Sequence, residues 1–284
     1  MIQREAAIEA LASRSFDVLV VGGGITGAGV ALDAASRGYS VALVERHDFA
    51  CGTSSRSSKL VHGGLRYLQS FDLGLVREAL LERQINVHMA PNLVKPLKMV
   101  VPAFEGEHPD RLVGVALNMY DGLALPTLRD ARRKRKGEDS GPPEPSDWSP
   151  DRHREIDGAT VAELLPALAP REPTGGYLFY DCQTDDVRLV LTVLDAATEW
   201  GAVVANRVNV TGLVESGGRA TGVTAVAEGG EPFEIRAAHI VNATGVWADR
   251  LRPGELRDEA EVPRIRPSRG THILLDEAYL PLAA

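Results

Sequence analysis

The sequence predicts an α/β fold, because a strand–helix–strand unit of the parallel-sheet type is followed later in the chain by a series of short β segments. An apolar, β-branched run at 16–21 leads into the glycine-rich segment 22–27 and then into a helix. A second apolar run at 40–44 completes a strand–helix–strand unit of about 30 residues. Short β segments follow at 202–242, and the Gly-Gly pairs between them are typical of a meander.

The glycine-rich segment has the pattern that dinucleotide-binding proteins use between their first strand and first helix. Gly22 allows a sharp turn, Gly24 lets the backbone approach a pyrophosphate, and Gly27 lets the helix and strand pack closely. The helix N-terminus offers N–H groups and a positive dipole end to the phosphates. A glycine turn in an α/β protein without a ligand is the alternative, and the surrounding strand and helix disfavour it.

Glu45 closes the second strand about 20 residues after Gly24, which is the spacing of a ribose-binding acid. Its carboxylate would accept hydrogen bonds from the ribose 2′- and 3′-hydroxyls. The same charge would repel a 2′-phosphate, so NADP is disfavoured. NAD and FAD share this pattern, and the motif alone leaves both open.

The remaining elements follow from periodicity and from breaking residues. We expect a helical leader at 1–15 and a charged, Pro-rich loop at 129–155. The other expected helices are 28–37, 72–90, 111–123, 160–168 and 185–200. The other expected strands are 97–104, 176–180, 202–206, 208–214, 220–227, 233–236, 239–242 and 271–275.

Composition excludes several classes of protein. The 284-residue chain has a net charge of −8 and only 5% aromatic residues, so we expect no nucleic-acid partner. Cys51 and Cys182 have no metal-ligand spacing, and we expect reduced thiols and no metal. No secretory signal and no apolar stretch of about 18 residues is present, which predicts a cytoplasmic location. Peripheral contact with the inner face of the cell membrane stays open, although a solvated loop is the favoured interpretation of the basic run at 132–136.

The segment CGTSSRSSKLVHGGLRYLQ at 51–69 closely resembles a signature of the FAD-dependent glycerol-3-phosphate dehydrogenase and oxidase family. The segment VNATGVW at 241–247 resembles the second flavin loop of that family, which usually has proline where Val246 stands. Tyr180-Asp181-Cys182 resembles a segment that leads into a helix, and we expect it to be architectural. The resemblance extends from Phe16 to about Leu275. It implies a GxGxxG-type FAD-binding domain with an interleaved, β-rich substrate domain.

The resemblance also implies roles for individual residues. Arg66 matches the residue that holds the phosphate of glycerol 3-phosphate, and Tyr67 is its neighbour in the pocket. Arg269 and His272 are further pocket candidates. His62 is the catalytic candidate and is expected near the flavin. A purely structural role for this histidine is nearly as well supported, and the general base is not assigned. The expected FAD-binding residues are Gly22, Gly24, Ile25, Thr26, Gly27, Glu45, Arg46, Thr53, Ser54, Ser55, Ser58, Lys59, Leu60, His62, Gly63, Val208, Ala243, Thr244, Gly245 and Trp247.

One oxidoreductase domain is expected at 16–284, with FAD-binding segments at about 16–95 and 180–250 and substrate segments at about 96–179 and 251–284. The implied reaction oxidises sn-glycerol 3-phosphate to dihydroxyacetone phosphate, with FAD as hydride acceptor and a quinone as the final acceptor. Oxygen is the alternative acceptor. An amine or 2-hydroxyacid oxidase is a second possibility, which the GGLRY run disfavours.

Members of the family are considerably longer than this chain. We expect the further part of such a protein to complete both sites. An inactive FAD-binding fragment is therefore a third possibility, in which the 284 residues alone bind FAD weakly and do not turn over substrate.

Overall fold

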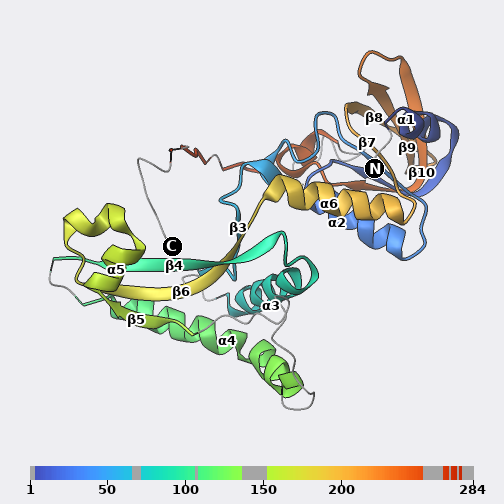
Figure 1. Cartoon of the computed structure of the whole chain (residues 1–284). Helices are drawn as coiled ribbons and strands as arrows, with labels where there is room; N and C mark the ends of the chain where they lie inside the picture. Colours follow the sequence, from blue (N-terminus) through green and yellow to red (C-terminus); the bar gives the residue numbers. More distant parts are fainter. Residues whose placement is uncertain are drawn as a thin grey trace. The chain divides into compact units, whose positions relative to one another are not determined.

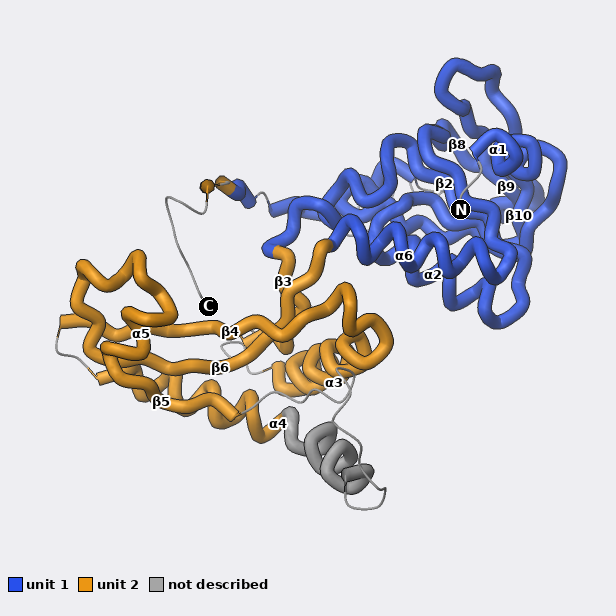
Figure 2. Tube along the Cα trace, in the orientation of Figure 1, with its two compact units in different colours: residues 1–58, 186–272 blue, residues 59–185, 273–284 orange. Residues whose placement is uncertain are grey.

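The chain passes back and forth between two structural units, as Figures 1 and 2 show for the computed structural model. The structure describes residues 4–65, 72–105, 108–135, 152–251, 265–268, 270–273 and 275–276. Unit 1 consists of residues 1–58 and 186–272, and unit 2 consists of residues 59–185 and 273–284.

Unit 1 is built on a six-stranded sheet with the order β7-β2-β1-β10-β9-β8. The strands β7, β2, β1 and β10 run parallel, whereas β10, β9 and β8 pair antiparallel. Val21 pairs with Val44 on one side and with Asn242 on the other, so these three parallel strands end at the same edge of the sheet. The strands are β1 Ser15–Val21, β2 Val41–Val44, β7 Val203–Ala205, β8 Val208–Ser216, β9 Arg219–Ala227 and β10 Pro232–Asn242.

Both faces of the parallel part of this sheet are buried, because alternate side chains of each strand join different cores. Helices α2 (Ile25–Ser36) and α6 (Asp186–Glu199) pack side by side on one face, where Val20 and Leu43 are fully buried. Helix α1 (Arg4–Ser13) packs on the other face together with residues of β8, β9 and β10. This burial explains why the strands are continuous apolar runs in the sequence.

Strand β10 is a single strand, whereas the sequence pattern predicts two at 233–236 and 239–242. Its first half pairs antiparallel with β9, and its second half pairs parallel with β1, with Arg236 at the change of partner. The two alanines at 237 and 238 interrupt the β-branched pattern, but pairing with β1 carries the strand through them.

Unit 2 is built on a four-stranded antiparallel sheet around β6 (Gly175–Thr184). Strand β4 (Val94–Ala103) pairs along all of β6, while β5 (Arg154–Asp157) and β3 (Leu60–Val61) pair with its two ends. The unit also contains helices α3 (Leu73–Met89), α4 (Arg111–Arg135) and α5 (Gly158–Leu164). Its buried residues form three smaller cores, centred on Leu80 with Tyr120, on Tyr177 with Phe179, and on Val94 with Cys182.

Three further sequence-based expectations differ from the structure. Helix α4 continues to Arg135, into the expected loop, because the added residues are mainly Arg, Lys and Ala, which are strong helix formers. Strand β5 lies within the same expected loop, where it is held by β6. The expected strand at 271–275 is not formed by the described residues there, which are exposed and have no regular structure.

The boundaries of the two units also differ from the expected segments. Residues 59–95 belong to unit 2, because α3 and β4 pack with α4 and β6. Residues 180–185 belong there too, because β6 is one continuous strand. Which segments bind FAD and which bind substrate stays a prediction.

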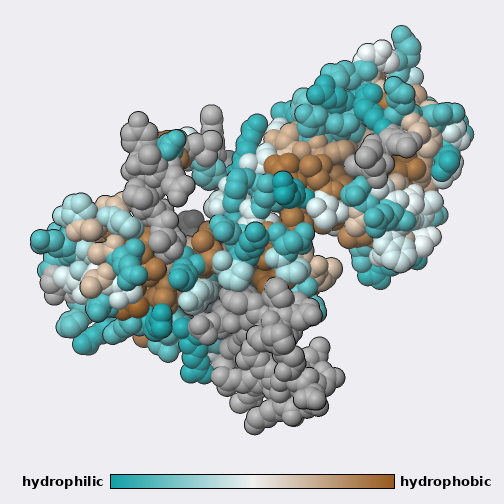
Figure 3. Space-filling model, viewed as in Figure 1, coloured by the Kyte–Doolittle hydropathy of each residue, from teal (hydrophilic) through white to brown (hydrophobic). Residues whose placement is uncertain are grey.

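Both cysteines are free thiols, of which Cys182 is buried and Cys51 is partly exposed. Among the described helices, none has both the length and the apolar character that crossing a bilayer requires. The visible surface of each unit is a mixture of hydrophilic and hydrophobic residues, as Figure 3 shows.

The packing of α2 against β1 generates a prediction about Gly27 and Gly29, which lie on opposite faces of this helix. A Cβ at Gly27 would overlap the carbonyl oxygen of Gly22, whereas a Cβ at Gly29 would meet open space. Gly27→Ala should therefore lower the free energy of unfolding by about 1–3 kcal/mol. Gly29→Ala is the matched control and should raise it by about 0.5–1 kcal/mol through helix propensity. Urea unfolding measures both, and equal effects of the two substitutions would contradict this packing.

Candidate functional site

A cavity of about 570 Å³ lies in unit 1, at the edge where β1, β2 and β10 end. Ligand sites in proteins commonly have volumes of about 300–1,000 Å³, and open parallel sheets place them at the carboxyl ends of their strands. The cavity is lined by residues from the turns that follow the strands and from strand β8. The lining residues are Val21, Gly22, Gly24, Ile25, Thr26, Val44, Glu45, Arg46, His47, Cys51, Gly52, Thr53, Ser54, Val208, Asn209, Val210, Thr211, Gly212, Ala243, Thr244, Gly245, Val246, Trp247, Arg250, Leu251 and Ile265.

The turn after β1 can be made only by a residue without a side chain. Gly22 has a φ of +116°, and a Cβ there would come within 2.5 Å of the carbonyl oxygen of Ala243. Gly24 then begins helix α2 as its N-cap, with an extended backbone. This turn brings the N-terminus of α2 to the wall of the cavity, where its N–H groups and dipole favour an anion.

Glu45 is anchored at both of its carboxylate oxygens. Oε2 accepts a hydrogen bond of 2.8 Å from the N–H of Gly23, and Oε1 accepts one of 2.9 Å from the N–H of His47. The backbone carbonyl of Glu45 accepts a hydrogen bond from the N–H of Val208, which connects β2 to the start of β8. A carboxylate has about four acceptor sites, so the anchored group still has lone pairs for ligand hydroxyls in the cavity.

The loop after β2 returns to the N-terminus of α2 through Ser54. The hydroxyl of Ser54 accepts a hydrogen bond of 2.9 Å from the N–H of Ile25, which is one of the helix N–H groups without an intrahelical acceptor. The hydroxyl of Ser57 donates a hydrogen bond of 2.8 Å to the carboxylate of Asp186 at the start of α6. These two contacts hold the serine-rich loop against the helices of unit 1.

The turn after β10 is stabilised by a single amide side chain. Oδ1 of Asn242 accepts a hydrogen bond of 2.6 Å from the hydroxyl of Thr244. Nδ2 of Asn242 donates hydrogen bonds of 2.9 Å to the carbonyl of Ala248 and 2.8 Å to that of Leu251. This amide therefore closes the short 3-10 turn at Gly245–Arg250 that carries Trp247 into the cavity.

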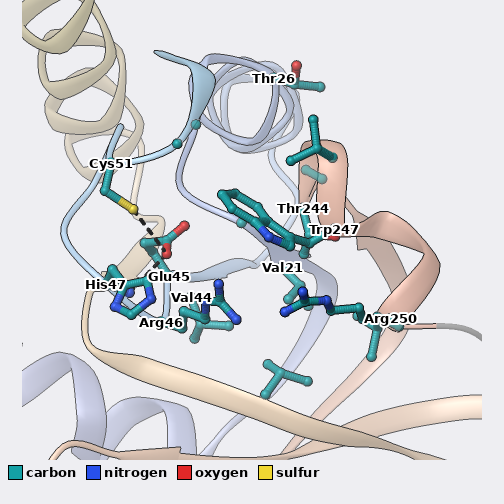
Figure 4. A pocket seen from close by; sticks show the side chains of 18 of the residues that line it. Val21, Thr26, Val44, Glu45, Arg46, His47, Cys51, Thr244, Trp247 and Arg250 are labelled. Carbon is teal, nitrogen blue, oxygen red and sulfur yellow. Dashed lines mark hydrogen bonds between the residues drawn. The ribbon is translucent and has the colours of Figure 1, made fainter. Parts of the chain in front are cut away.

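Two arginines give the cavity a local positive charge, although the chain carries −8 overall. The guanidinium carbon of Arg46 lies 5.2 Å from the ring centroid of Trp247, a cation–π contact. Figure 4 shows Arg46 and Arg250 extending from separate loops into the same cavity. The arrangement suits a ligand that has both a flat ring and an anionic group.

Cys51 lines this cavity, and its surroundings keep the thiol protonated. Burial raises the pKa of the Cys51 thiol, and the carboxylate of Glu45 raises it further. The Sγ atom lies 4.0 Å from Oε1 of Glu45. The thiol therefore acts as a small wall group of the cavity at neutral pH.

The structure brings most of the expected cofactor residues of unit 1 together at this cavity. Those that line it are Gly22, Gly24, Ile25, Thr26, Glu45, Arg46, Thr53, Ser54, Val208, Ala243, Thr244, Gly245 and Trp247. Gly27, Ser55 and Ser58 belong to unit 1 but do not line the cavity, since Gly27 is buried between α2 and β1.

The other expected site residues are placed differently. Lys59, Leu60, His62 and Gly63 belong to unit 2 and do not line the cavity. His272 is exposed in unit 1 and does not line it either. The expected substrate residues Arg66, Tyr67 and Arg269 lie outside the described residues.

Sequence reasoning missed several lining residues, of which Arg250 matters most for the charge of the cavity. Arg250 follows Trp247 by three positions, and residues three apart lie on the same side of a helical turn. This spacing from Trp247 is the feature of the sequence that could have identified Arg250 as a lining residue. The contributions of Val210 and Gly212 had no local signal, because the position of β8 depends on its pairing with β9.

The glycine-pair segment, residues 62–67, contains Gly63 and Gly64, and the structure describes its first four residues, which belong to unit 2. The side chain of His62 is exposed, and its Nδ1 accepts a hydrogen bond of 2.9 Å from the N–H of Gly64. The neutral imidazole therefore carries its proton on Nε2. Across the described residues, no group of three or more His, Cys, Asp or Glu side chains is arranged to hold a metal ion.

Comparison with known proteins gives a consistent result over nearly the whole chain. The family model described as "FAD dependent oxidoreductase" matches residues 17–283. A "Glycerol-3-phosphate dehydrogenase" of Mycobacterium leprae is 40% identical over 275 residues, covering 96% of this chain and 43% of the relative. An "Alpha-glycerophosphate oxidase" of Streptococcus pneumoniae is 36% identical over 289 residues, covering 99% of this chain and 43% of the relative.

Solved structures show the same fold. The glycerol-3-phosphate dehydrogenase of Bacillus halodurans, solved with FAD, has a TM-score of 0.60 and 30% identity, covering 86% of this chain and 37% of that chain. A glycine oxidase of Geobacillus kaustophilus, at 22% identity and a TM-score of 0.56, covers 84% of this chain and 57% of that chain and shares the fold alone. The chain thus spans less than half the length of the curated relatives it matches. On the strength of the family match over residues 17–283, the chain belongs to the FAD-dependent oxidoreductase family.

Proposed function

We propose that this chain is the FAD-binding part of an enzyme that oxidises sn-glycerol 3-phosphate to dihydroxyacetone phosphate. The observation that carries the proposal is the cavity of unit 1, whose wall combines the glycine turn, the anchored Glu45 and the Trp247 loop. The relatives named above, at 36–40% identity, support the choice of substrate.

The residues of the cavity fit the adenosine and pyrophosphate part of FAD. Glu45 would accept hydrogen bonds from the ribose hydroxyls, for which its anchored carboxylate is already oriented. The N-terminus of α2 and Ser54 would hold the pyrophosphate. Arg46 and Arg250 would supply positive charge beside it. A Cβ at Gly24 would come within 3.2 Å of the Ser54 hydroxyl, so glycine also keeps this approach open.

The substrate would be held by residues of the glycine-pair segment. Arg66 would hold the phosphate through its planar fork, with Tyr67 beside it. When bound, the flavin supplies the hydride acceptor for C2 of the substrate. His62 would lie near the flavin. Its donor group there would be Nε2–H, because its Nδ1 accepts a hydrogen bond from the N–H of Gly64. Arg269 and His272 remain candidates for substrate binding. A general base other than His62 would take the proton of the C2 hydroxyl.

A quinone is the proposed final electron acceptor. Because quinones are confined to the bilayer, the enzyme would contact the inner face of the cell membrane from the cytoplasm. Helix α4 supports this contact, because it carries two exposed apolar side chains, Leu112 (78% exposed) and Val115 (58% exposed). Oxygen is the alternative, which the similarity to the Streptococcus pneumoniae oxidase favours. Hydrogen peroxide formation during turnover would identify the oxidase.

The proposal is tested with the purified protein in its complete natural length. The released cofactor should have a flavin spectrum, and glycerol 3-phosphate should reduce an electron-accepting dye. Glycerol is the matched control, because it lacks only the phosphate. Stoichiometric NAD without flavin, or equal activity on glycerol and glycerol 3-phosphate, would show that the proposed function is wrong.

The anchored carboxylate of Glu45 generates a prediction about cofactor affinity. Glu45→Gln keeps the size of the side chain but removes the charge, and it should weaken FAD binding by about 1–3 kcal/mol. Titration with FAD, followed by quenching of flavin fluorescence, measures the change. Asp48→Asn is the matched control, because Asp48 is an exposed acid of the same loop that does not line the cavity. Equal FAD affinity of the two variants would count against the ribose role.

The proposed phosphate site generates a prediction about Arg66. Arg66→Ala should lower kcat/KM for glycerol 3-phosphate by about 100-fold or more, because a charge-assisted bidentate contact is lost. Arg66→Lys should recover only part of this loss, since a point charge does not reproduce the planar fork. Steady-state kinetics of both variants measures the effect. Full activity of Arg66→Ala would remove Arg66 from the site.

A further inference from the structure

We propose that Tyr120, supported by Asp181 and Arg83, is a positioning residue that holds the backbone of the His62–Gly64 segment for the reaction. The inference rests on the proposed function, which assigns His62 to the reaction. Tyr120 lies on α4, Arg83 on α3 and Asp181 on β6, so three separate elements of unit 2 converge on one short loop.

A chain of hydrogen bonds connects the loop to these three side chains. The N–H of Gly63 donates a hydrogen bond of 2.8 Å to the hydroxyl of Tyr120. The same hydroxyl donates a hydrogen bond of 2.8 Å to Oδ1 of Asp181. Nη1 of Arg83 donates to that oxygen at 2.6 Å and to the carbonyl of Tyr180 at 3.1 Å.

The direction of each hydrogen bond in this chain is determined by chemistry. A guanidinium and a backbone N–H can only donate, and an ionised carboxylate can only accept. The single proton of the Tyr120 hydroxyl is therefore directed to Asp181, and its lone pairs face the N–H of Gly63. The N–H of Gly63 also lies 3.3 Å from Oδ1 of Asp181, which is a weaker contact.

The three side chains are buried, with exposed fractions of 2% for Arg83, 2% for Tyr120 and 4% for Asp181. Burial raises the pKa of the Tyr120 hydroxyl strongly, so the hydroxyl keeps its proton across the physiological range. The charges of Arg83 and Asp181 compensate each other. In such surroundings a hydrogen bond is stronger than in water, and losing a partner is costly.

The loop is also held sterically at the point where the hydrogen bond is made. A Cβ at Gly63 would come within 2.5 Å of the Tyr120 hydroxyl and would overlap the side chain of Leu80 on α3. Glycine is therefore required for this N–H to reach the hydroxyl. The next N–H, that of Gly64, donates to Nδ1 of His62 at 2.9 Å. Holding Gly63 thus also holds the turn that orients the imidazole of His62 and selects its Nε2–H form.

This network contacts the loop as well as the core of unit 2. Well-packed apolar residues of similar volume commonly replace a buried ion pair without loss of stability. Through Tyr120, this pair instead holds the N–H of Gly63, within the segment to which the proposed function assigns His62. We therefore expect loss of the hydroxyl to change the rate of the reaction more than the affinity for the cofactor.

The test uses the FAD-loaded protein in its complete natural length and compares Tyr120→Phe with Tyr177→Phe. Tyr177 is the matched control, because it is a buried tyrosine of the same unit whose hydroxyl donates to Glu155 at 3.2 Å, outside this network. Both variants lose one hydroxyl and keep the ring that packs in the core. Three quantities are measured: the rate of flavin reduction at saturating glycerol 3-phosphate, the affinity for FAD, and hydrogen exchange of the Gly63 N–H.

For Tyr120→Phe we expect flavin reduction to slow by about 10-fold or more, as expected for small misplacement of reacting groups. We expect exchange of the Gly63 N–H to accelerate by about 10-fold or more, because it loses its short acceptor. FAD affinity should stay within about 2-fold of the unmutated protein for both variants, and so should the reduction rate of Tyr177→Phe.

Equal reduction rates in the two variants would overturn the positioning role, even if both lower the melting temperature. Unchanged exchange of the Gly63 N–H in Tyr120→Phe would overturn it as well. If the unmutated protein itself shows no reduction by glycerol 3-phosphate, the proposed function fails and this inference falls with it.

Discussion

The architecture of unit 1 depends on a close approach of backbone segments where β1, α2 and the turn after β10 meet. A Cβ at Gly22 would come within 2.5 Å of the Ala243 carbonyl oxygen, and one at Gly27 would overlap the carbonyl oxygen of Gly22. Because both positions are glycine, the helix N-terminus and three strand ends share one small region. The same steric constraint therefore packs the core and places the N-terminus of α2, whose dipole favours an anion, at the wall of the cavity.

The two units organise their polar groups in different ways. In unit 1, Glu45, Ser54 and Asn242 each hold nearby backbone groups, which orients the loops around the cavity. In unit 2, a buried ion pair and Tyr120 hold one N–H of a loop. The first arrangement leaves acceptor sites for a ligand at the cavity, whereas the second is buried and determines the path of the chain.

Similarity to other proteins distinguishes the shared fold from the choice of substrate, which depends on individual residues. The glycine oxidase of Geobacillus kaustophilus, at 22% identity, shares this fold. A common fold does not determine the substrate. The proposal of a phosphate-bearing substrate therefore rests on the segment at 51–69 and on the relatives with 36–40% identity.

The sequence alone determined the β1–α2–β2 unit, helices α3 and α6, and the meander, because apolar periodicity and glycine positions are local signals. It also indicated Glu45, Ser54 and Trp247 as residues of one site, and the structure brings them to one cavity. Only the tertiary structure decided that β10 changes partners at Arg236 and that β3 and β4 pair with β6. It alone placed Arg250 in the cavity and joined Gly63 to Tyr120 and Asp181. These contacts connect residues far apart in the chain, and no local pattern records which distant segment a strand or a buried polar group will meet.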